Sequence, residues 1–318
     1  MELRQLQYAL QIAAEKNFSR AAEKLHIAQP SLSQQLSKLE KELGVLLFQR
    51  NTNSVELTHA GSAFMEKAQM ILDMVGQLER EMEDISDMKK GRLNVGSLPI
   101  TGSHMLPRVL PLFHSRFPGI EIHLIEDTTN VLENLTAAGR TDISLLTLPV
   151  LDSNLSWEPL LDEEILLAVP PTHPLAGRAA PDETATVSIR QLREEAFIVL
   201  KRGQGFRQIA LELCRSNGFE PRIVFESSNI ETVQSLVAAG MGIAFVPSMI
   251  ALGHGTSFRP DYLQLKERPY RTLVAAYRKG RYISKAAEAF MGVMREVMNK
   301  GDGSEPPVQP APGVEQED

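Results

Sequence analysis

The chain has 318 residues, of which 43% are hydrophobic and 23% charged, so it is long enough for more than one folded domain. Its net charge of −7 excludes a strongly basic nucleic-acid binder, although the five acids of residues 301–318 contribute most of that charge. Cys214 is the single cysteine, which excludes an intramolecular disulfide and fits a reducing cytoplasm. The polar first residues lack the apolar run of a secretion signal, so we expect a cytoplasmic protein.

Two segments of unusual composition need separate interpretation. Residues 301–318 combine acids with four prolines and no base, a composition typical of a disordered tail. Residues 233–252 carry no charge and have the length of a membrane helix, but Gly240, Gly242 and Pro247 interrupt them. A helix, a turn and a buried strand explain this segment better, so we expect no membrane partner.

The first 58 residues predict three helices and a two-stranded wing. Apolar residues at helical spacing place the first helix over residues 2–15, and Asn17 can cap the second. Pro30 suits the first turn of the third helix, which Gly44 ends. The apolar face of that third helix consists of Leu32, Leu36, Leu39 and Leu43. A helix-turn-helix followed by a wing is a device for reading the major groove of DNA.

The opposite, polar face of the third helix supplies candidate DNA contacts. Gln34 can bond an adenine edge in two places, Lys38 can reach a phosphate, and Arg50 in the wing can contact phosphate or the minor groove. Any one of these residues could equally belong to a solvated face, but the set as a whole favours DNA. The candidate DNA-binding residues are Ser19, Arg20, Gln29, Pro30, Ser31, Ser33, Gln34, Lys38, Arg50 and Thr58.

A heptad pattern of apolar residues follows the wing and covers residues 59–88. Its members are Phe64, Ala68, Ile71, Val75, Leu78, Met82 and Ile85. Such a seam is stabilising when a second helix packs against it. We therefore predict a linker helix that pairs two copies of the chain and brings two recognition helices to a two-fold DNA site. The alternative is a helix packed on the C-terminal part of its own chain.

Residues 89–300 alternate strands and helices, and the same order occurs twice. The first unit has strands at 93–98, 120–125 and 142–146 and helices at 103–116 and 129–138. The second unit has strands at 197–200, 222–225 and 242–246 and helices at 204–216 and 229–239. Ala-Ala-Gly at 137–139 recurs at 238–240, before the last strand of each unit. This alternation predicts parallel sheets in two lobes with a cleft between them.

Ligands of such sheets bind beyond the carboxyl ends of the strands, near helix N-termini. Hydroxyl groups and helix amides there suit a small anion or a polar metabolite. Lys201 and Arg202 favour a carboxylate, unless they are solvated loop charges. The candidate effector-binding residues are Pro99, Ile100, Thr101, Ser103, Thr128, Thr129, Lys201, Arg202, Gly203, Phe206, Val246 and Pro247.

Taken together, the motifs resemble the LysR-type transcriptional regulators over residues 1–297. The resemblance is carried by Phe18-Ser19-Arg20-Ala21-Ala22, Gln29-Pro30-Ser31-Leu32-Ser33-Gln34-Gln35, Leu57-Thr58-His59-Ala60-Gly61, Phe117-Pro118, His173-Pro174-Leu175-Ala176 and Val237-Ala238-Ala239-Gly240-Met241-Gly242-Ile243-Ala244. Ile100 stands where the family often has a hydroxyl, so either Thr101 or Ser103 takes that role, or the pocket differs.

The resemblance implies a fold class and a domain order. It implies an α+β winged helix-turn-helix domain at 1–58 and a long linker helix at 59–88. An α/β two-lobed effector domain of the type 2 periplasmic-binding-protein kind follows at 89–300, with lobe I at about 91–162 and 268–300 and lobe II at about 163–267. It also implies a homotetramer, built from linker-helix dimers, that binds double-stranded DNA, responds to a small inducer and acts on RNA polymerase.

An enzyme, or a cytoplasmic small-molecule binding protein without a DNA role, is the competing interpretation. Cys214 lies on an apolar helix, where a buried inert thiol is expected rather than a nucleophile. The histidines show no metal spacing, and no acid–base pair has a reason to be close, so we expect no metal, no cofactor and no catalytic residue. A transport-type binding protein would explain residues 89–300 but not 1–88. The expected function is sequence-specific DNA binding modulated by a small, anionic effector.

Overall fold

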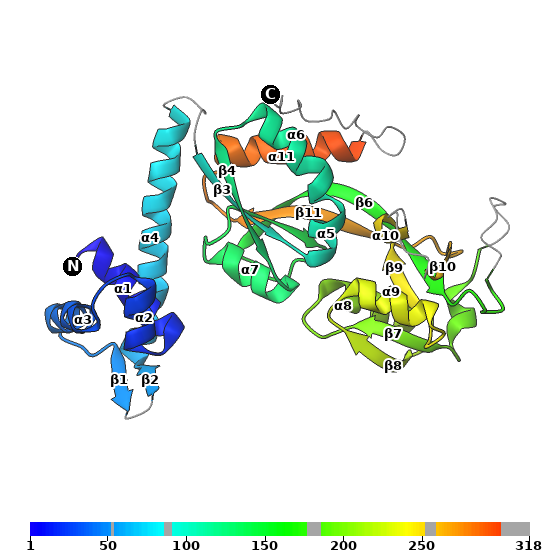
Figure 1. The fold of residues 1–318 in the computed structure, drawn as a ribbon, viewed down its shortest axis with the longest axis horizontal. Coiled ribbons are helices and arrows are strands. Elements are labelled where there is room, and N and C mark those ends of the chain that lie inside the picture. The colour runs from blue at the N-terminus through cyan, green and yellow to red at the C-terminus, as the bar shows by residue number, and fades with distance from the viewer. Residues whose placement is uncertain (52–53, 86–90, 177–185, 252–258, 300–318) are drawn as a thin grey trace, which may run out of the picture.

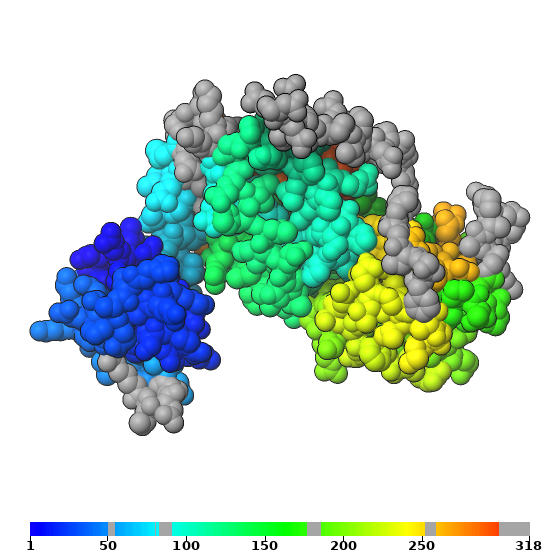
Figure 2. All heavy atoms as spheres, viewed as in Figure 1, coloured from blue at the N-terminus to red at the C-terminus, as the bar shows by residue number. Residues whose placement is uncertain are grey.

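A computed structural model describes residues 1–51, 54–85, 91–176, 186–251 and 259–299 (Figure 1). A small N-terminal domain lies at one end, a long helix rises from it, and two lobes follow. Figure 2 shows the N-terminal domain as a separate body, while the two lobes touch one another. The tail at 301–318 lies outside the described residues.

Three helices and a hairpin form the N-terminal domain. They are α1 (Leu3–Glu15), α2 (Phe18–Lys24), α3 (Gln29–Leu43), β1 (Phe48–Asn51) and β2 (Ser54–Leu57). The Asn17 side chain caps α2 by accepting from the Arg20 amide, and Gly44, with φ at 73°, ends α3. β1 and β2 pair antiparallel. These features confirm the helix-turn-helix and the wing that the sequence predicts.

The linker helix α4 (His59–Ile85) has 27 residues and is about 40 Å long. Its first turns pack on α1 of the N-terminal domain. Its far end reaches the height of lobe I in Figure 1. This one helix therefore spans the distance between the domain with the recognition helix and the lobes.

Lobe I contains three parallel strands covered by helices. The strands are β3 (Gly91–Ser97), β4 (Ile120–Glu126) and β5 (Ile143–Thr147), and the helices are α5 (Pro99–His104), α6 (Leu106–Arg116), α7 (Thr129–Ala137) and α11 (Lys285–Asn299). Phe113 and Phe290 lie in its core, with ring centroids 5.3 Å apart. The prediction of one helix over 103–116 is wrong, because Pro107 lacks the amide that would continue α5, and a second helix begins at Leu106.

Lobe II repeats the strand and helix order. Its elements are η1 (Ile189–Leu192), β7 (Ala196–Leu200), α8 (Gly205–Ser216), β8 (Arg222–Ser227), α9 (Ile230–Ala238), β9 (Ala244–Pro247), α10 (Ser248–Ala251) and β10 (Asp261–Leu263). The described part of the uncharged stretch, 233–251, forms a helix, a turn and a buried strand, as expected, and adds the short helix α10. Among the described helices, none has the length and apolar character needed to span a membrane.

Two long strands cross between the lobes. β6 (Leu155–Val169) and β11 (Tyr270–Arg278) pair antiparallel, and β11 also pairs antiparallel with β5. β9 joins the far end of β6, again antiparallel. The predicted parallel pairing is confirmed within the lobes, for β3 with β4 and β5 and for β7 with β8. The antiparallel pairs were not predicted, because β6 and β11 run out to lobe II and back and lie outside the repeated units. A pair of crossing strands leaves the two lobes able to change their relative angle.

Candidate functional site

Helix α3 presents the polar surface that the sequence predicts for DNA contact. Leu32, Leu36 and Leu39 are buried against the domain core. The exposed residues of α3 include Gln29, Pro30, Ser31, Gln34 and Lys38, and Ser33 is half-buried. The sequence thus folds with an apolar face inward and an uncharged-to-basic face outward, the surface needed to approach a groove.

At the start of α2 and in the wing, fewer of the predicted polar side chains are available to contact DNA. Ser19 is exposed, and the guanidinium of Arg20 donates to the Glu15 carbonyl at 2.9 Å. The Thr58 hydroxyl donates to the Leu46 carbonyl at 2.7 Å and accepts from the Gly61 amide at 2.8 Å. This corrects the prediction for Thr58, whose proton is used inside the protein, so it caps α4 rather than donating to phosphate. The side chain of Arg50 lies outside the described part of the wing.

The heptad seam of α4 divides into two halves. Ala68 is 1% exposed and the half-buried Phe64 packs on the N-terminal core, so both residues already make contacts within their own chain. Further along, Ile71, Leu78 and Met82 are exposed. A shallow hollow is lined by Ile71, Met74, Val75, Gln77, Leu78 and Glu81. The side chain of Ile85 lies outside the described residues. The unpaired apolar surface therefore begins near Ile71.

A cavity of about 330 Å³ lies between the lobes. It is lined by Leu98, Pro99, Ile100, Ser103, His104, Thr128, Leu200, Gln204, Gly205, Phe206, Ser228, Asn229, Ile230, Glu231 and Arg271. The walls come from α5 and the residue before α7 in lobe I, from α8 and α9 in lobe II, and from the crossing strand β11. Mostly apolar walls with a few polar groups are typical of a small-molecule site.

Arg271 is a buried charged group in the lining of this cavity. Its side chain is fully buried and its Nη2 lies 2.7 Å from Glu163 Oε2. Burial lowers the pKa of Arg271, and Glu163 opposes that shift. The guanidinium lies 5.4 Å from the centroid of the Phe206 ring. Its Nη1 has no hydrogen-bond partner among the described residues, and a buried unpaired donor is costly unless a ligand or water accepts from it.

A hydrogen bond beside this cavity joins the two lobes. The Gly205 amide, in the first turn of α8, donates to Thr129 Oγ1 at the start of α7, at 2.9 Å. On the far side of this contact is a second cavity of about 690 Å³, whose lining includes Thr129, Thr147, Arg202 and Gly203. Gln204 and Gly205 line both cavities, so the Thr129–Gly205 contact separates them.

The predicted effector residues are only partly brought together. Pro99, Ile100, Ser103, Thr128 and Phe206 line the first cavity. Thr101 is 1% exposed and does not line this cavity, so of Thr101 and Ser103 it is Ser103 that faces the cleft. Val246 and Pro247 are buried in β9 against β6, and neither they nor Lys201 lie in the lining of these two cavities. Arg271, His104 and Asn229 were missed. Arg271 lies within β11 and His104 at the end of α5, while Asn229 follows β8, a strand end from which the predicted set took no residue.

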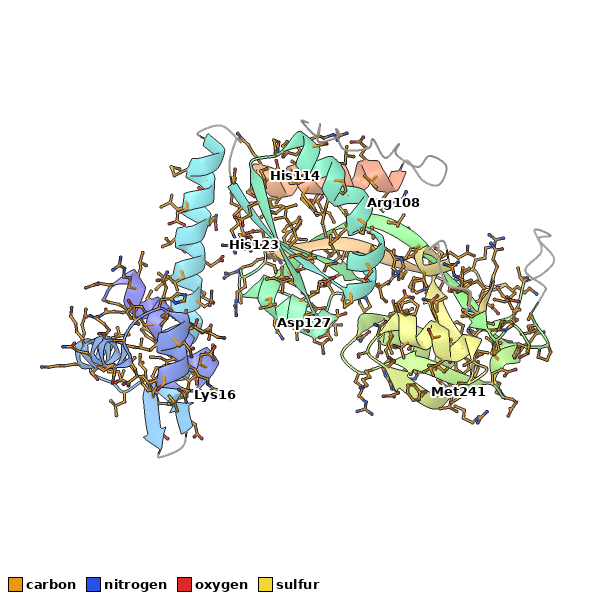
Figure 3. The ribbon with its side chains drawn as sticks, viewed as in Figure 1. Lys16, Arg108, His114, His123, Asp127 and Met241 are labelled. Carbon is orange, nitrogen blue, oxygen red and sulfur yellow. The ribbon has the colours of Figure 1, made fainter. Side chains whose placement is uncertain are left out.

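The cysteine and the histidines of the described residues can be placed one by one. Burial raises the pKa of Cys214 to about 12, so its thiol stays protonated near neutral pH. His114 and His123 lie on separate elements of lobe I, and Asp127 lies at the end of β4 (Figure 3). Within the described ranges, no group of three or more histidine, cysteine, aspartate or glutamate side chains could hold a metal ion.

Two family models match the chain, and together they cover nearly all of it. Residues 3–62 match the bacterial regulatory helix-turn-helix protein model of the lysR family, and residues 86–299 match the LysR substrate binding domain. The chain belongs to the LysR family of transcriptional regulators. Its winged domain, linker helix and two-lobed domain are the DNA-binding and effector-binding parts of such a regulator.

Several known proteins are similar over nearly the whole length. The uncharacterized HTH-type transcriptional regulator YcgK of Bacillus subtilis is 41% identical over 312 residues, covering 94% of this chain and 96% of YcgK. The DNA-binding transcriptional dual regulator OxyR of Escherichia coli is 31% identical over 300 residues, covering 94% and 96%. A full-length OxyR structure from Pseudomonas aeruginosa has a TM-score of 0.75 at 28% identity and covers 96% of this chain and 99% of its own.

Proposed function

We propose that this regulator changes its DNA binding when a small molecule with a hydrogen-bond acceptor, such as a carboxylate, occupies the cavity beside Arg271. The observation that carries the proposal is the unpaired, buried Nη1 of Arg271 at a mostly apolar inter-lobe cavity. Glu163 neutralises much of the Arg271 charge, so the ligand needs one acceptor group and an apolar body that contacts Ile100 and Phe206.

Both lobes contribute to the cavity, so a bound molecule would favour one lobe angle over others. A ligand shifts a conformational equilibrium only by the difference between its affinities for the two states. A molecule that contacts both Ser103 of lobe I and Asn229 of lobe II would bind more tightly at the lobe angle that brings both residues within reach. RNA polymerase is the partner on which a transcriptional regulator would then act.

The DNA-bound form is proposed to be a homo-oligomer built on α4. The exposed Ile71, Leu78 and Met82 are large apolar side chains on one helix face, and pairing with a second copy would bury them. Two copies would present two α3 helices to a two-fold site, and association of the lobes would extend the dimer to a tetramer.

Relatives whose name is hydrogen peroxide-inducible genes activator raise the question of peroxide sensing here. Peroxide reacts with a thiolate, and a reversible sensor usually pairs a reactive cysteine with a second one. This chain has one cysteine, and burial raises the pKa of the Cys214 thiol to about 12. Control by a non-covalent effector therefore accounts for the cleft better than control by a disulfide.

The test is a thermal-shift screen of small carboxylic acids and their neutral amides on the full-length protein. Acids that raise the unfolding temperature are then added to a footprinting reaction with DNA upstream of the protein's own gene. We expect such an acid to change the footprint of the wild-type protein and to leave the footprint of Arg271→Lys unchanged. A set of stabilising acids that change both footprints equally would place the effector elsewhere.

A further inference from the structure

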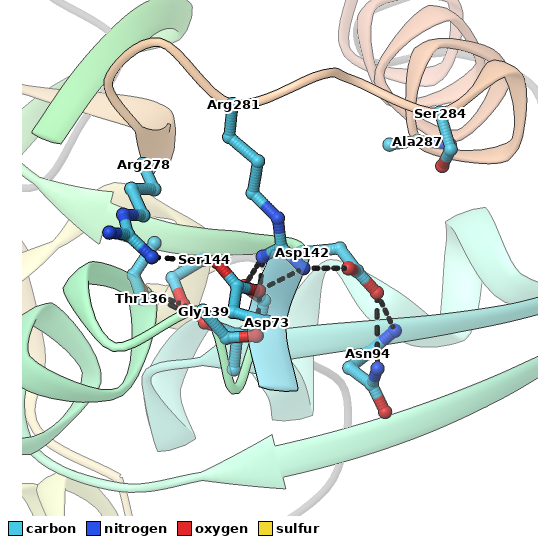
Figure 4. Close-up of polar contacts among 11 residues, drawn as sticks. Asp73, Asn94, Thr136, Gly139, Asp142, Ser144, Arg278, Arg281, Ser284 and Ala287 are labelled. Atoms are coloured by element: carbon cyan, nitrogen blue, oxygen red, sulfur yellow. Dashed lines mark hydrogen bonds and ion pairs between the residues drawn. The ribbon is translucent and has the colours of Figure 1, made fainter. Parts of the chain in front are cut away.

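The carboxylate of Asp73, in the middle of the linker helix α4, is buried against lobe I. Its side chain is 6% exposed, although it belongs to a helix that leads away from the N-terminal domain. Arg278 Nη1 lies 2.6 Å from Asp73 Oδ2, and Arg281 Nη2 lies 2.8 Å from Asp73 Oδ1 (Figure 4). Arg278, the last residue of the crossing strand β11, and Arg281, three residues later, thus hold one residue of the linker helix.

Gly139 of lobe I is shaped around the same carboxylate. It follows α7 with φ at 73°, and a Cβ added there would lie 2.2 Å from Asp73 Oδ1. Gly240 occupies the equivalent place after α9 in lobe II, with φ at 82° and nothing within 4 Å of the same added atom. Both glycines suit a left-handed helix end. Of the two, only Gly139 lies where a side chain of α4 occupies the space that a Cβ would need.

Further bonds fix this docking point within lobe I. Arg281 Nη1 donates to the carbonyls of Gly139 and Thr141, and Arg281 Nη2 lies 3.4 Å from Asp142 Oδ1. The Asn94 amide in β3 donates to Asp142 Oδ2 at 2.8 Å. Two arginines and two aspartates balance in charge, so the cluster tolerates burial as a unit but not the loss of one member.

Helix α7 connects this docking point with the inter-lobe contact. Its first residue, Thr129, accepts from Gly205 of lobe II, and Gly139 follows its other end. Nine helical residues span about 14 Å. Midway, Glu133 accepts from the amides of Leu151 and Asp152, which holds α7 on the body of lobe I. In Figure 1, α7 lies between α4 and lobe II.

Docking of α4 leaves its apolar seam available. Asp73 and Val75 are two positions apart, which is about 200° around a helix. Asp73 therefore faces lobe I while Leu78 and Met82, on the side of Val75, remain exposed. One helix can hold a partner chain on one face and its own effector domain on the opposite face.

We propose that Asp73 is the positioning residue that docks the linker helix on lobe I, and that α7 makes this docking depend on the state of the inter-lobe cleft. The angle of the winged domain is then set by the Asp73 cluster rather than by the linker helix alone. The effect of this docking on DNA binding rests on the proposed function. The docking itself is measured without DNA or ligand, so the docking role and the proposed function can fail separately.

The test measures the distance between spin labels at Lys67→Cys on α4 and Arg108→Cys on α6, both exposed positions, in labelled full-length chains co-assembled with an excess of unlabelled chain. The native Cys214 is buried and takes up little label. We expect one narrow distance distribution for the parent protein. Asp73→Asn, Arg278→Gln and Gly139→Ala should each broaden it about two-fold or lengthen its mean, because they release α4.

Gly240→Ala is the matched control, since it imposes the same left-handed strain where no neighbour is met. It should keep the narrow distribution. A parent-like distribution in both Asp73→Asn and Gly139→Ala would overturn the docking role. Equal broadening in Gly139→Ala and Gly240→Ala, with Asp73→Asn unchanged, would assign the effect to backbone strain and overturn it as well.

The dependence on the cleft is tested with Gly205→Leu in place of a ligand. A Cβ at Gly205 would already lie 3.0 Å from Thr129 Oγ1, so a leucine must push α8 and α7 apart. The label distance should change in the parent protein and not in the Asp73→Asn background. An unchanged distance in the parent protein would overturn the role of α7.

Discussion

The Gly205 amide donates a 2.9 Å hydrogen bond to the Thr129 hydroxyl, and this bond joins the first turns of two helices from different lobes. This contact lies between the two inter-lobe cavities. Gly205 lines both cavities, so a molecule bound in either one can contact one partner of this bond.

Thr129→Val should weaken this contact without changing the volume of the side chain. The Gly205 amide would lose its acceptor, and hydrogen exchange in a peptide covering 203–207 should accelerate about 2–10-fold, the equivalent of one hydrogen bond. Thr128→Val is the control, because the Thr128 hydroxyl bonds Asp127 in its own lobe. Equal exchange rates in Thr129→Val and wild type would show that the contact is not maintained in solution.

Arg271→Met should destabilise the two-lobed domain by about 3–5 kcal/mol, because it leaves the buried Glu163 carboxylate without its partner. The double substitution with Glu163→Met should recover much of that loss. Chemical unfolding followed by the fluorescence of Trp157, the single tryptophan and a residue of β6, measures both. A double variant less stable than Arg271→Met would contradict the pairing.

Leu78→Glu should dissociate the linker-helix pair. It places a charge in the exposed apolar seam, where a second helix would have to bury it. Met70→Glu adds the same charge to an exposed apolar position of α4 that does not line the hollow between Ile71 and Glu81. Sedimentation should report smaller species for Leu78→Glu and not for Met70→Glu. If both variants dissociate, or if neither does, the interface lies elsewhere.

Cys214 should resist alkylation up to high pH. Burial raises the pKa of the folded thiol to about 12 from an ordinary value of 9.0, so the thiolate needed for reaction is scarce in the folded protein. Because the folded pKa is raised, the group's contribution to stability is complete below pH 9 and is lost as pH rises toward 12. Rapid labelling of the native protein at pH 8, measured by intact mass, would contradict this burial.

The winged domain could be predicted closely from the sequence because its signals are local. The leucines of α3, the cap at Asn17 and the glycine at position 44 act within one or two turns of each helix. The heptad of α4 was harder to interpret, because the pattern alone does not show that Ala68 is buried while Leu78 is exposed.

The site residues that sequence reasoning missed depend on long-range pairs. Arg271 and Glu163 are 108 positions apart and meet only because β6 and β11 cross between the lobes. Asp73 and Arg278 are 205 positions apart. Neither pair has a spacing signal, and β6 and β11 have no counterpart in the repeated strand and helix pattern from which the lobes were predicted.

The central claim is sequence-specific DNA binding through α3, and Gln34 tests it most directly. Purified wild-type protein and Gln34→Ala would each select from sheared genomic fragments at fixed salt, with Lys38→Ala as a charge control. We predict that the wild type enriches a defined set containing two-fold sites. Gln34→Ala should lose about 1–3 kcal/mol of discrimination, and Lys38→Ala should weaken binding to all fragments alike. Enrichment of no fragment by the wild type, or of the same set with the same preference by Gln34→Ala, would contradict the account.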